Sequence, residues 1–205
     1  AIAYYAFSYT NTGNYNVAIA RDAMGANTGG SGVALGAYAL DAQTTGSSNT
    51  AIGYQSLSSL TDADYNTACG HEAGESLTTG DENTFLGFQA GHGATTGDRN
   101  TSVGESALQG CTTGGFNVAI GSRAMISGTG NNNVIIGKSA AEDGSFTGNN
   151  TVAIGYYALS QLESSSQNTA VGAYAGQDLT TGLYCTLIGY TAGKDITTAT
   201  GCTVV

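Results

Sequence analysis

Residues Asn49-Thr50-Ala51-Ile52-Gly53-Tyr54-Gln55 belong to a motif that recurs along all 205 residues of the chain. The copies align on the small residue that ends each apolar run, and most successive copies are 17 residues apart, the others 16 or 18. Twelve positions hold this small residue: Ala3, Ala20, Gly36, Gly53, Gly70, Gly87, Gly104, Gly121, Gly137, Gly155, Gly172 and Gly189. A short fixed period is typical of a solenoid, in which each repeat forms one coil stacked on its neighbours.

Turn-forming residues occur at two places in each copy. An Asn such as Asn66 precedes the apolar run, and Asn suits a corner because it tolerates left-handed backbone. A second corner is expected at elements such as Thr78-Thr79-Gly80, with Gly supplying positive φ. Two turns leave two strands of about five residues in each copy. A helical repeat is excluded because each interior Gly costs a helix about 1 kcal/mol.

These features predict an all-β fold, a parallel β-solenoid of about twelve 17-residue coils. No linker or second domain is left over, so we expect a single repetitive domain over residues 1–205. Because the sequence starts inside a repeat, we interpret it as a piece of a longer polypeptide.

Two columns of the repeat are restricted to apolar or small residues. The residue before the small one, such as Ile52 or Ile120, is always apolar and is expected to be a buried strand position. The third residue after the small one is Ala in every copy except at Ser56. Its members are Ala6, Ala23, Ala39, Ala73, Ala90, Ala107, Ala124, Ala140, Ala158, Ala175 and Ala192. Because one coil buries little apolar surface, we predict that this Ala column is the contact line of a parallel homotrimer.

The composition excludes several partners. Fifteen acidic residues against five basic ones give a net charge of −10, which disfavours nucleic acid and anionic membranes. No run of 18 apolar residues is present, so we expect no membrane insertion.

The strings Asn49-Thr50-Ala51-Ile52-Gly53-Tyr54-Gln55, Asn117-Val118-Ala119-Ile120-Gly121 and Asn168-Thr169-Ala170-Val171-Gly172 resemble the head repeats of trimeric autotransporter adhesins of the YadA type. With the Thr-Thr-Gly spacer they are more similar still to repeats of the same 17-residue length in phage tail fibres and related bacterial trimeric fibres. The resemblance covers essentially the whole chain. It implies a left-handed β-roll that is trimeric, extracellular and active in attachment, and it carries no catalytic residues to transfer.

We therefore expect a structural and adhesive segment of a longer extracellular fibre, on a virion tail fibre or a bacterial cell surface. The alternative is a glycan-binding or host-receptor-binding module in its own right. A third interpretation is an ice-binding solenoid with Thr ladders at the corners, but the Thr-Thr-Gly pattern is interrupted in copies such as Thr61-Asp62-Ala63.

The sequence contains no recognised catalytic or metal-binding motif. His71 and His92 are the two histidines, interpreted as exposed loop residues, and Glu72 beside His71 is expected to face the opposite way on a strand. The acid pairs Asp81-Glu82 and Glu142-Asp143 are interpreted as solvated turn charges. We expect no enzyme, no cofactor and no metal site.

The aromatic residues follow the small residue of the repeat. Tyrosines at these positions form a candidate ladder for stacking sugar rings: Tyr38, Tyr54, Tyr156, Tyr157, Tyr174 and Tyr190. The competing interpretation is that Tyr is a good strand residue whose ring covers the neighbouring coil.

The four cysteines fall into two pairs by position. Cys185 and Cys202 replace the corner Asn of successive coils, which would place their Cα atoms about 4.8 Å apart, within disulfide range. We predict a bridge between them, with free thiols or bridges between chains as the alternatives. Cys69 and Cys111 occupy apolar slots of non-adjacent coils and are expected to be buried thiols.

Overall fold

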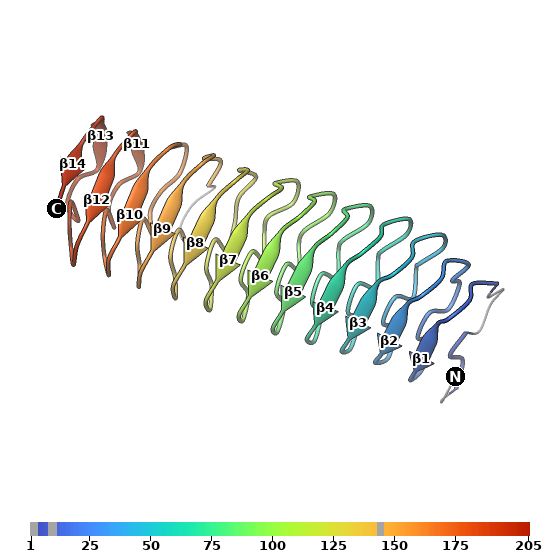
Figure 1. The fold of residues 1–205 in the computed structure, drawn as a ribbon. Helices are drawn as coiled ribbons and strands as arrows, with labels where there is room; N and C mark the ends of the chain where they lie inside the picture. The colour runs from blue at the N-terminus through green and yellow to red at the C-terminus, as the bar shows by residue number, and fades with distance from the viewer. Residues whose placement is uncertain (1–3, 8–11, 143–145) are drawn as a thin grey trace.

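The computed structural model describes residues 4–7, 12–142 and 146–205, and shows a parallel β-solenoid of about eleven turns with no helix in this part of the chain. The coils stack along one axis, with the two ends of the chain at opposite ends of the stack (Figure 1). Ala3 and Asp143, named in the sequence interpretation, lie outside the described residues. None of the described segments is a helix that could cross a bilayer.

One strand from each coil enters a 12-stranded parallel sheet in the order β1 to β10, β12, β14, and β11 pairs with β13 in a separate sheet. The bounds are β1 Val17–Ile19, β2 Val33–Leu35, β3 Thr50–Ile52, β4 Thr67–Cys69, β5 Thr84–Leu86, β6 Thr101–Val103, β7 Val118–Ile120, β8 Val134–Ile136, β9 Val152–Ile154, β10 Thr169–Val171, β11 Thr181–Leu183, β12 Thr186–Ile188, β13 Thr198–Thr200 and β14 Thr203–Val204.

Neighbouring strands pair in the register of the repeat. Ala51 of β3 lies opposite Ala68 of β4, and the same slot-to-slot pairing runs through the sheet. The irregular intervals are absorbed outside the strands, since Val118 still pairs with Val134 and Val134 with Val152. The repeat alignment and the solenoid are therefore confirmed.

The second predicted strand of each coil is replaced, in most coils, by a chain of turns with alternating backbone handedness, here called the turn segment. In one coil Gly53, Gln55 and Leu57 have φ of 135°, 54° and 50°. The Gly53 N–H donates to Leu35 O of the preceding coil at 2.8 Å, whereas the Leu57 N–H donates to Ala73 O of the following coil at 3.0 Å. The two-strand prediction was wrong because this side bonds its neighbours in two directions without becoming extended.

Glycine is required for different reasons at the small-residue position after the strand and at the Thr-Thr-Gly corner. Gly87 has φ of 139°, and a Cβ there would lie 2.6 Å from Gly104 O of the next coil. Gly97 of a Thr-Thr-Gly corner does not have positive φ, contrary to expectation. A Cβ on Gly97 would lie 2.2 Å from Gly114 O, so close stacking of coils requires the glycine there.

The inward and outward columns differ from the sequence interpretation. The middle residue of the strand, such as Ala51 or Ala119, points into the coil and is fully buried. The apolar residue after it, such as Ile52, faces outward and keeps 37% of its surface exposed, so its assignment to the core was wrong. In a three-residue strand only one side chain can face the narrow interior, and the flanking two must face out.

The Ala column lies inside the single chain. Ala23, Ala39, Ala73, Ala90, Ala107, Ala124, Ala140, Ala158 and Ala175 have no exposed surface, Ala192 is buried, and Ala6 is partly buried against the same core. Buried side chains cannot meet another chain, so the interpretation of this column as an intermolecular contact line is corrected. Its small size reflects the close approach of the two sides of one coil.

Candidate interaction surfaces

The outward side of the 12-stranded sheet, here called the strand face, consists of two parallel columns without a charged residue. The first column is Thr or Val at every strand: Val17, Val33, Thr50, Thr67, Thr84, Thr101, Val118, Val134, Val152, Thr169, Thr186 and Thr203. The second is Ile19, Leu35, Ile52, Cys69, Leu86, Val103, Ile120, Ile136, Ile154, Val171 and Ile188. Leu86 keeps 47% of its surface exposed and Ile188 42%.

The second column is apolar throughout, whereas seven of the twelve residues in the first column are Thr, so the strand face is an uncharged and largely apolar surface. The strand face extends over almost the whole length of the solenoid, and no described segment covers it (Figure 1). Contiguous apolar patches beyond a few hundred Å² usually mark an interaction site. The strand face is therefore the strongest candidate for association.

The predicted tyrosines lie along one edge of the solenoid in two runs. The first run contains Tyr38 and Tyr54, with ring centroids 5.9 Å apart. It continues through His71, 5.1 Å from Tyr54, and Phe88, 5.5 Å from His71. Both rings occupy the same slot as Tyr54 in the next coils: Phe88 belongs to the aromatic column that the sequence predicts, whereas the stacking of His71 was not expected.

The second run contains the other four tyrosines. Tyr156 lies 4.6 Å from Tyr157 and 5.3 Å from Tyr174, and Tyr174 lies 6.2 Å from Tyr190. Coils carrying Glu105, Ser122 and Lys138 in the slot of Tyr156 separate the two runs. The rings cover one another across coils yet remain partly exposed, so the geometry accommodates both interpretations of the tyrosines.

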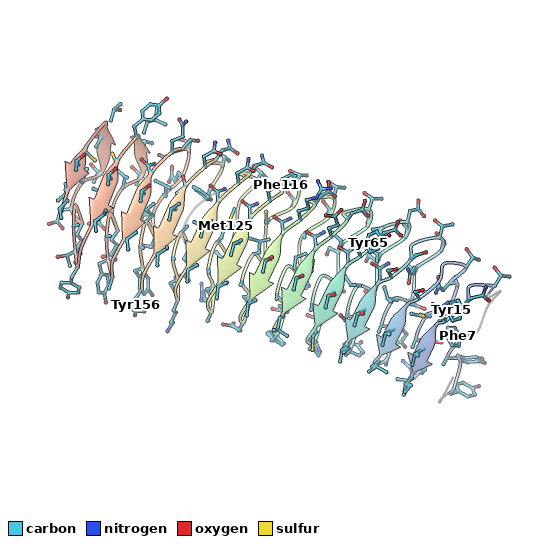
Figure 2. The ribbon with its side chains drawn as sticks, in the orientation of Figure 1. Phe7, Tyr15, Tyr65, Phe116, Met125 and Tyr156 are labelled. Atoms are coloured by element: carbon cyan, nitrogen blue, oxygen red, sulfur yellow. The ribbon has the colours of Figure 1, made fainter. Side chains whose placement is uncertain are left out.

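Another set of exposed aromatic residues lies along the opposite edge, where Figure 2 shows Tyr15, Tyr65 and Phe116 away from Tyr156. Each sits just before the Asn slot with φ near 60°, as does Tyr184. Two intervening coils carry Glu82 and Arg99, so these rings form no continuous run. The repeat aligns these aromatic residues in one slot, but the slot also holds charged residues, so the sequence alone did not indicate an aromatic column.

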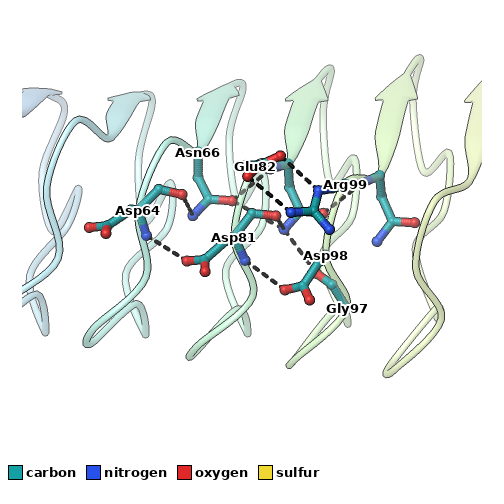
Figure 3. Close-up of polar contacts among 9 residues, drawn as sticks. Asp64, Asn66, Asp81, Glu82, Gly97, Asp98 and Arg99 are labelled. Atoms are coloured by element: carbon teal, nitrogen blue, oxygen red, sulfur yellow. Dashed lines mark hydrogen bonds and ion pairs between the residues drawn. The ribbon is translucent and has the colours of Figure 1, made fainter.

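The acid pair Asp81-Glu82 is exposed, as expected of solvated turn charges, and is also bonded to neighbouring coils. The Asp81 carboxylate accepts the Asp64 N–H at 2.8 Å, and the Asp81 N–H donates to the Asp98 carboxylate at 2.9 Å (Figure 3). The Arg99 guanidinium donates to Glu82 at 2.8 Å, which lowers the pKa of the Glu82 carboxyl. Glu142 is buried with Arg123 Nε 2.5 Å from its carboxylate.

The histidines lie outside the strands as expected, His71 exposed and His92 partly exposed, and each contacts neighbouring side chains. His71 stacks in the first aromatic run, with Nδ1 3.5 Å from Glu72 Oε1. The two neighbours do not face opposite ways, because they lie in the turn segment and not in a strand. His92 of the next coil has Nε2 2.8 Å from Glu75.

The cysteines differ in burial. Cys185 and Cys202 occupy matching positions, since the following residues Thr186 and Thr203 pair across β12 and β14. Cys185 is buried, so this slot is not an unconstrained corner as expected. Both are thiols in the structure, and burial together with a hydrogen bond to Cys185 raises the pKa of Cys202 to about 11.

The expectation of buried thiols is confirmed for one of the other two cysteines. Cys111 is fully buried, and burial raises the pKa of its thiol to about 11. Cys69 belongs to the outward column of the strand face and is only partly buried.

Compared with protein-family models, curated proteins and solved structures, the chain has no significant match in any of the three.

Proposed function

We propose that this chain is a structural and adhesive segment of an extracellular trimeric fibre, and that its copies associate through the strand face. The observation that carries the proposal is the strand face itself, two uncharged columns left exposed along the solenoid. The fibre role and its place, on a virion tail fibre or a bacterial cell surface, rest on the resemblance of the repeats. The proposal includes no enzymatic activity and no cofactor.

A second copy fits the strand face better than an unrelated partner does. The face repeats the same two positions at every coil, one Thr or Val and the other apolar, so an identical chain placed parallel offers the same spacing along the whole contact. Obligate interfaces between copies resemble a domain core cut in half, and they bury more apolar surface than transient contacts. A trimer is still expected because one coil buries little apolar surface, but its contact is the strand face and not the Ala column.

Charge substitution on the strand face tests the association. We expect light scattering to give a trimer for the native chain and a monomer for Ile52→Lys/Ile120→Lys, because two buried ammonium groups per chain would remain unpaired. Both side chains point outward, so the circular dichroism spectrum of the coils should persist.

The matched control is Thr79→Lys/Thr96→Lys, which adds the same charge at two exposed corner positions and should leave the trimer intact. A native chain that is monomeric at micromolar concentration would overturn the proposal. So would a double Ile variant that remains trimeric.

Glycan binding is a second candidate, favoured by the partly exposed rings of the two aromatic runs. Tyr190 is 76% exposed and Tyr54 43% exposed at the edge of the solenoid. If the segment binds sugars itself, a glycan array should give hits that Tyr190→Ala or Tyr54→Ala weakens, while Tyr15→Ala on the opposite edge leaves them unchanged. An array without hits would reject this candidate, and hits that survive both substitutions would reject the aromatic runs as the binding site.

Ice binding is a third candidate, now favoured by the regular Thr and Val column of the strand face and not by the Thr corners. It requires the strand face to stay uncovered, so it excludes the proposed trimer contact. A monomer with thermal hysteresis that Thr84→Lys abolishes would support ice binding in place of the fibre role.

A further inference from the structure

A compact group of metal-ligating side chains spans two neighbouring coils beside the first aromatic run. Glu72, Glu75 and His92 each offer one ligand atom, and these atoms lie within 4.8 Å of one another. His92 Nε2 is 2.8 Å from Glu75 Oε2 and 3.9 Å from Glu72 Oε2. Donor atoms around a tetrahedral ion with bonds of about 2.0–2.1 Å lie roughly 3.3 Å apart, between these two distances.

Stacking of the coils creates the group. Glu75 and His92 occupy the same slot of successive repeats, five residues after Gly70 and Gly87, so the solenoid places one directly against the other. Glu72 lies three residues before Glu75 on the same turn segment and points to the same place. Other described coils do not combine these residues, so the site is single and not a ladder.

A second layer of polar groups orients the donors. The Gln89 side-chain amide donates to Glu72 Oε2 at 2.7 Å, and the Gln109 amide donates to Gln89 Oε1 at 3.1 Å. His71 Nδ1 approaches the other oxygen of Glu72 at 3.5 Å. Hydrogen bonds of this kind hold ligating carboxylates in place at metal sites.

We propose that Glu72, Glu75 and His92 bind one divalent first-row transition metal ion, with Zn²⁺ as the representative ion. One imidazole nitrogen and two carboxylate oxygens are donors that Zn²⁺ accepts, and water can complete the tetrahedron because the three side chains are partly exposed. Ca²⁺ fits poorly because it takes six to eight oxygen ligands. The ion would join two adjacent coils and so stabilise the solenoid.

Titration calorimetry with ZnCl₂ tests the site on the full chain, carrying no polyhistidine tag. We expect one Zn²⁺ per chain and no binding of CaCl₂. His92→Ala and Glu75→Gln should each weaken Zn²⁺ binding by at least about tenfold, the lower end of the loss seen even for outer-layer partners. Glu82→Gln, an acid in the column of Tyr65 and Phe116, is the matched control and should bind as the native chain does.

A shift of the His92 Nε2 resonance on adding Zn²⁺ should identify the ligating nitrogen, and Zn²⁺ should raise the melting temperature of the native chain but not of His92→Ala. The variants are at partly exposed positions, and their circular dichroism spectra report whether the coils remain folded. No Zn²⁺ binding by the native chain would overturn the proposal. Equal affinity in the native chain and His92→Ala would overturn it as well.

Discussion

At the scale of single residues, a column of buried asparagines holds consecutive coils together. The Asn83 N–H donates to Asn66 Oδ1 at 2.9 Å, and Asn83 Nδ2 donates to Gly97 O at 2.9 Å. Asn83 Nδ2 also donates to Asn66 Oδ1 at 3.1 Å, and Asn83 Oδ1 accepts the Asn100 N–H at 2.9 Å, so the side chain bonds to the coils on both sides. The left-handed residue at this corner is the preceding Glu82, with φ of 59°, and not the Asn as the sequence suggested. The Asn is selected for its amide in the interior.

Removing one amide should therefore destabilise the solenoid. We expect Asn83→Ala to lower the free energy of unfolding by about 1–3 kcal/mol, because it leaves buried backbone groups without partners. Urea denaturation at a fixed protein concentration measures the change. Thr79→Ala, at an exposed position of the preceding corner, should change it little, and an equal loss in both variants would contradict the role of the amide.

The Glu82–Arg99 pair predicts a pH effect of definite sign. The hydrogen bond and positive charge of Arg99 lower the folded-state pKa of Glu82, so its stabilising contribution is present above the ordinary Glu pKa. That contribution is lost as the pH falls through the lowered folded-state value. An NMR titration should give Glu82 a lower midpoint in the native chain than in Arg99→Gln; identical midpoints would contradict the pairing.

The thiols carry a third prediction at this scale. We expect Cys185 and Cys202 to form an intrachain disulfide under oxidising conditions, because they lie in matching slots and Cys185 faces the interior and not another chain. Mass spectrometry of a non-reduced digest checks it, and alkylation of both without prior reduction would reject it. Cys111, with a thiol pKa of about 11 from burial, should stay unalkylated until the chain unfolds.

At the scale of the coil, interior volume is shared between the strand and the turn segment. Phe85 replaces the usual Ala at the centre of a strand, and Gly74 and Gly91 face it across the coil. A Cβ on Gly91 would lie 2.5 Å from Phe85 Cδ1, and one on Gly74 would lie 2.7 Å from Phe85 Cδ2. The same exchange occurs at Leu187, where Gly176 and Gly193 replace the larger residue.

This exchange predicts coupling between the two positions. Phe85→Ala should cost about 3–5 kcal/mol through the cavity it leaves, and Gly91→Leu alone about 1–3 kcal/mol through overpacking. The double variant should lose about 0.5–3 kcal/mol less free energy of unfolding than the two single variants lose in total, because the Leu side chain fills the space left by Phe85. Leu108 in the same slot has φ of 56°, so the backbone there accepts Leu. Denaturant titrations of the four proteins give the coupling, and strictly additive losses would contradict shared volume.

At the scale of the whole molecule, three acids outside the proposed metal group have structural partners. The Asp81 carboxylate accepts the Asp64 N–H of the preceding coil, Glu82 pairs with Arg99, and Glu142 pairs with Arg123. We therefore expect no cleavage of polysaccharides, since general acid–base hydrolysis requires two carboxyl groups free to act on one bond. Reducing-end assays across a polysaccharide panel check this, and turnover that disappears in Glu142→Gln would contradict it.

The sequence by itself determined the period, the parallel register and the all-β solenoid. Each coil repeats the same contacts with its neighbours, so a one-dimensional alignment such as Gly53 to Gly70 to Gly87 already states the stacking. The same alignment places Glu75 and His92 in one slot of successive coils, which indicates that the two side chains of the proposed metal site lie together. This proximity is missed when each histidine is considered only within its own copy.

Only the tertiary structure decided which columns of the repeat face the interior and which face outward. Ile52 and Ala51 are both apolar, and residue type alone favours burying the larger one. The narrow coil reverses this choice. Its two sides approach so closely that the strand centre is Ala in most coils, and a larger residue there, such as Phe85, requires Gly across the coil, while Ile52 lies on the outside. The alternating handedness of the turn segment was equally hidden, because it depends on hydrogen bonds to the coils on both sides and not on local residue preference.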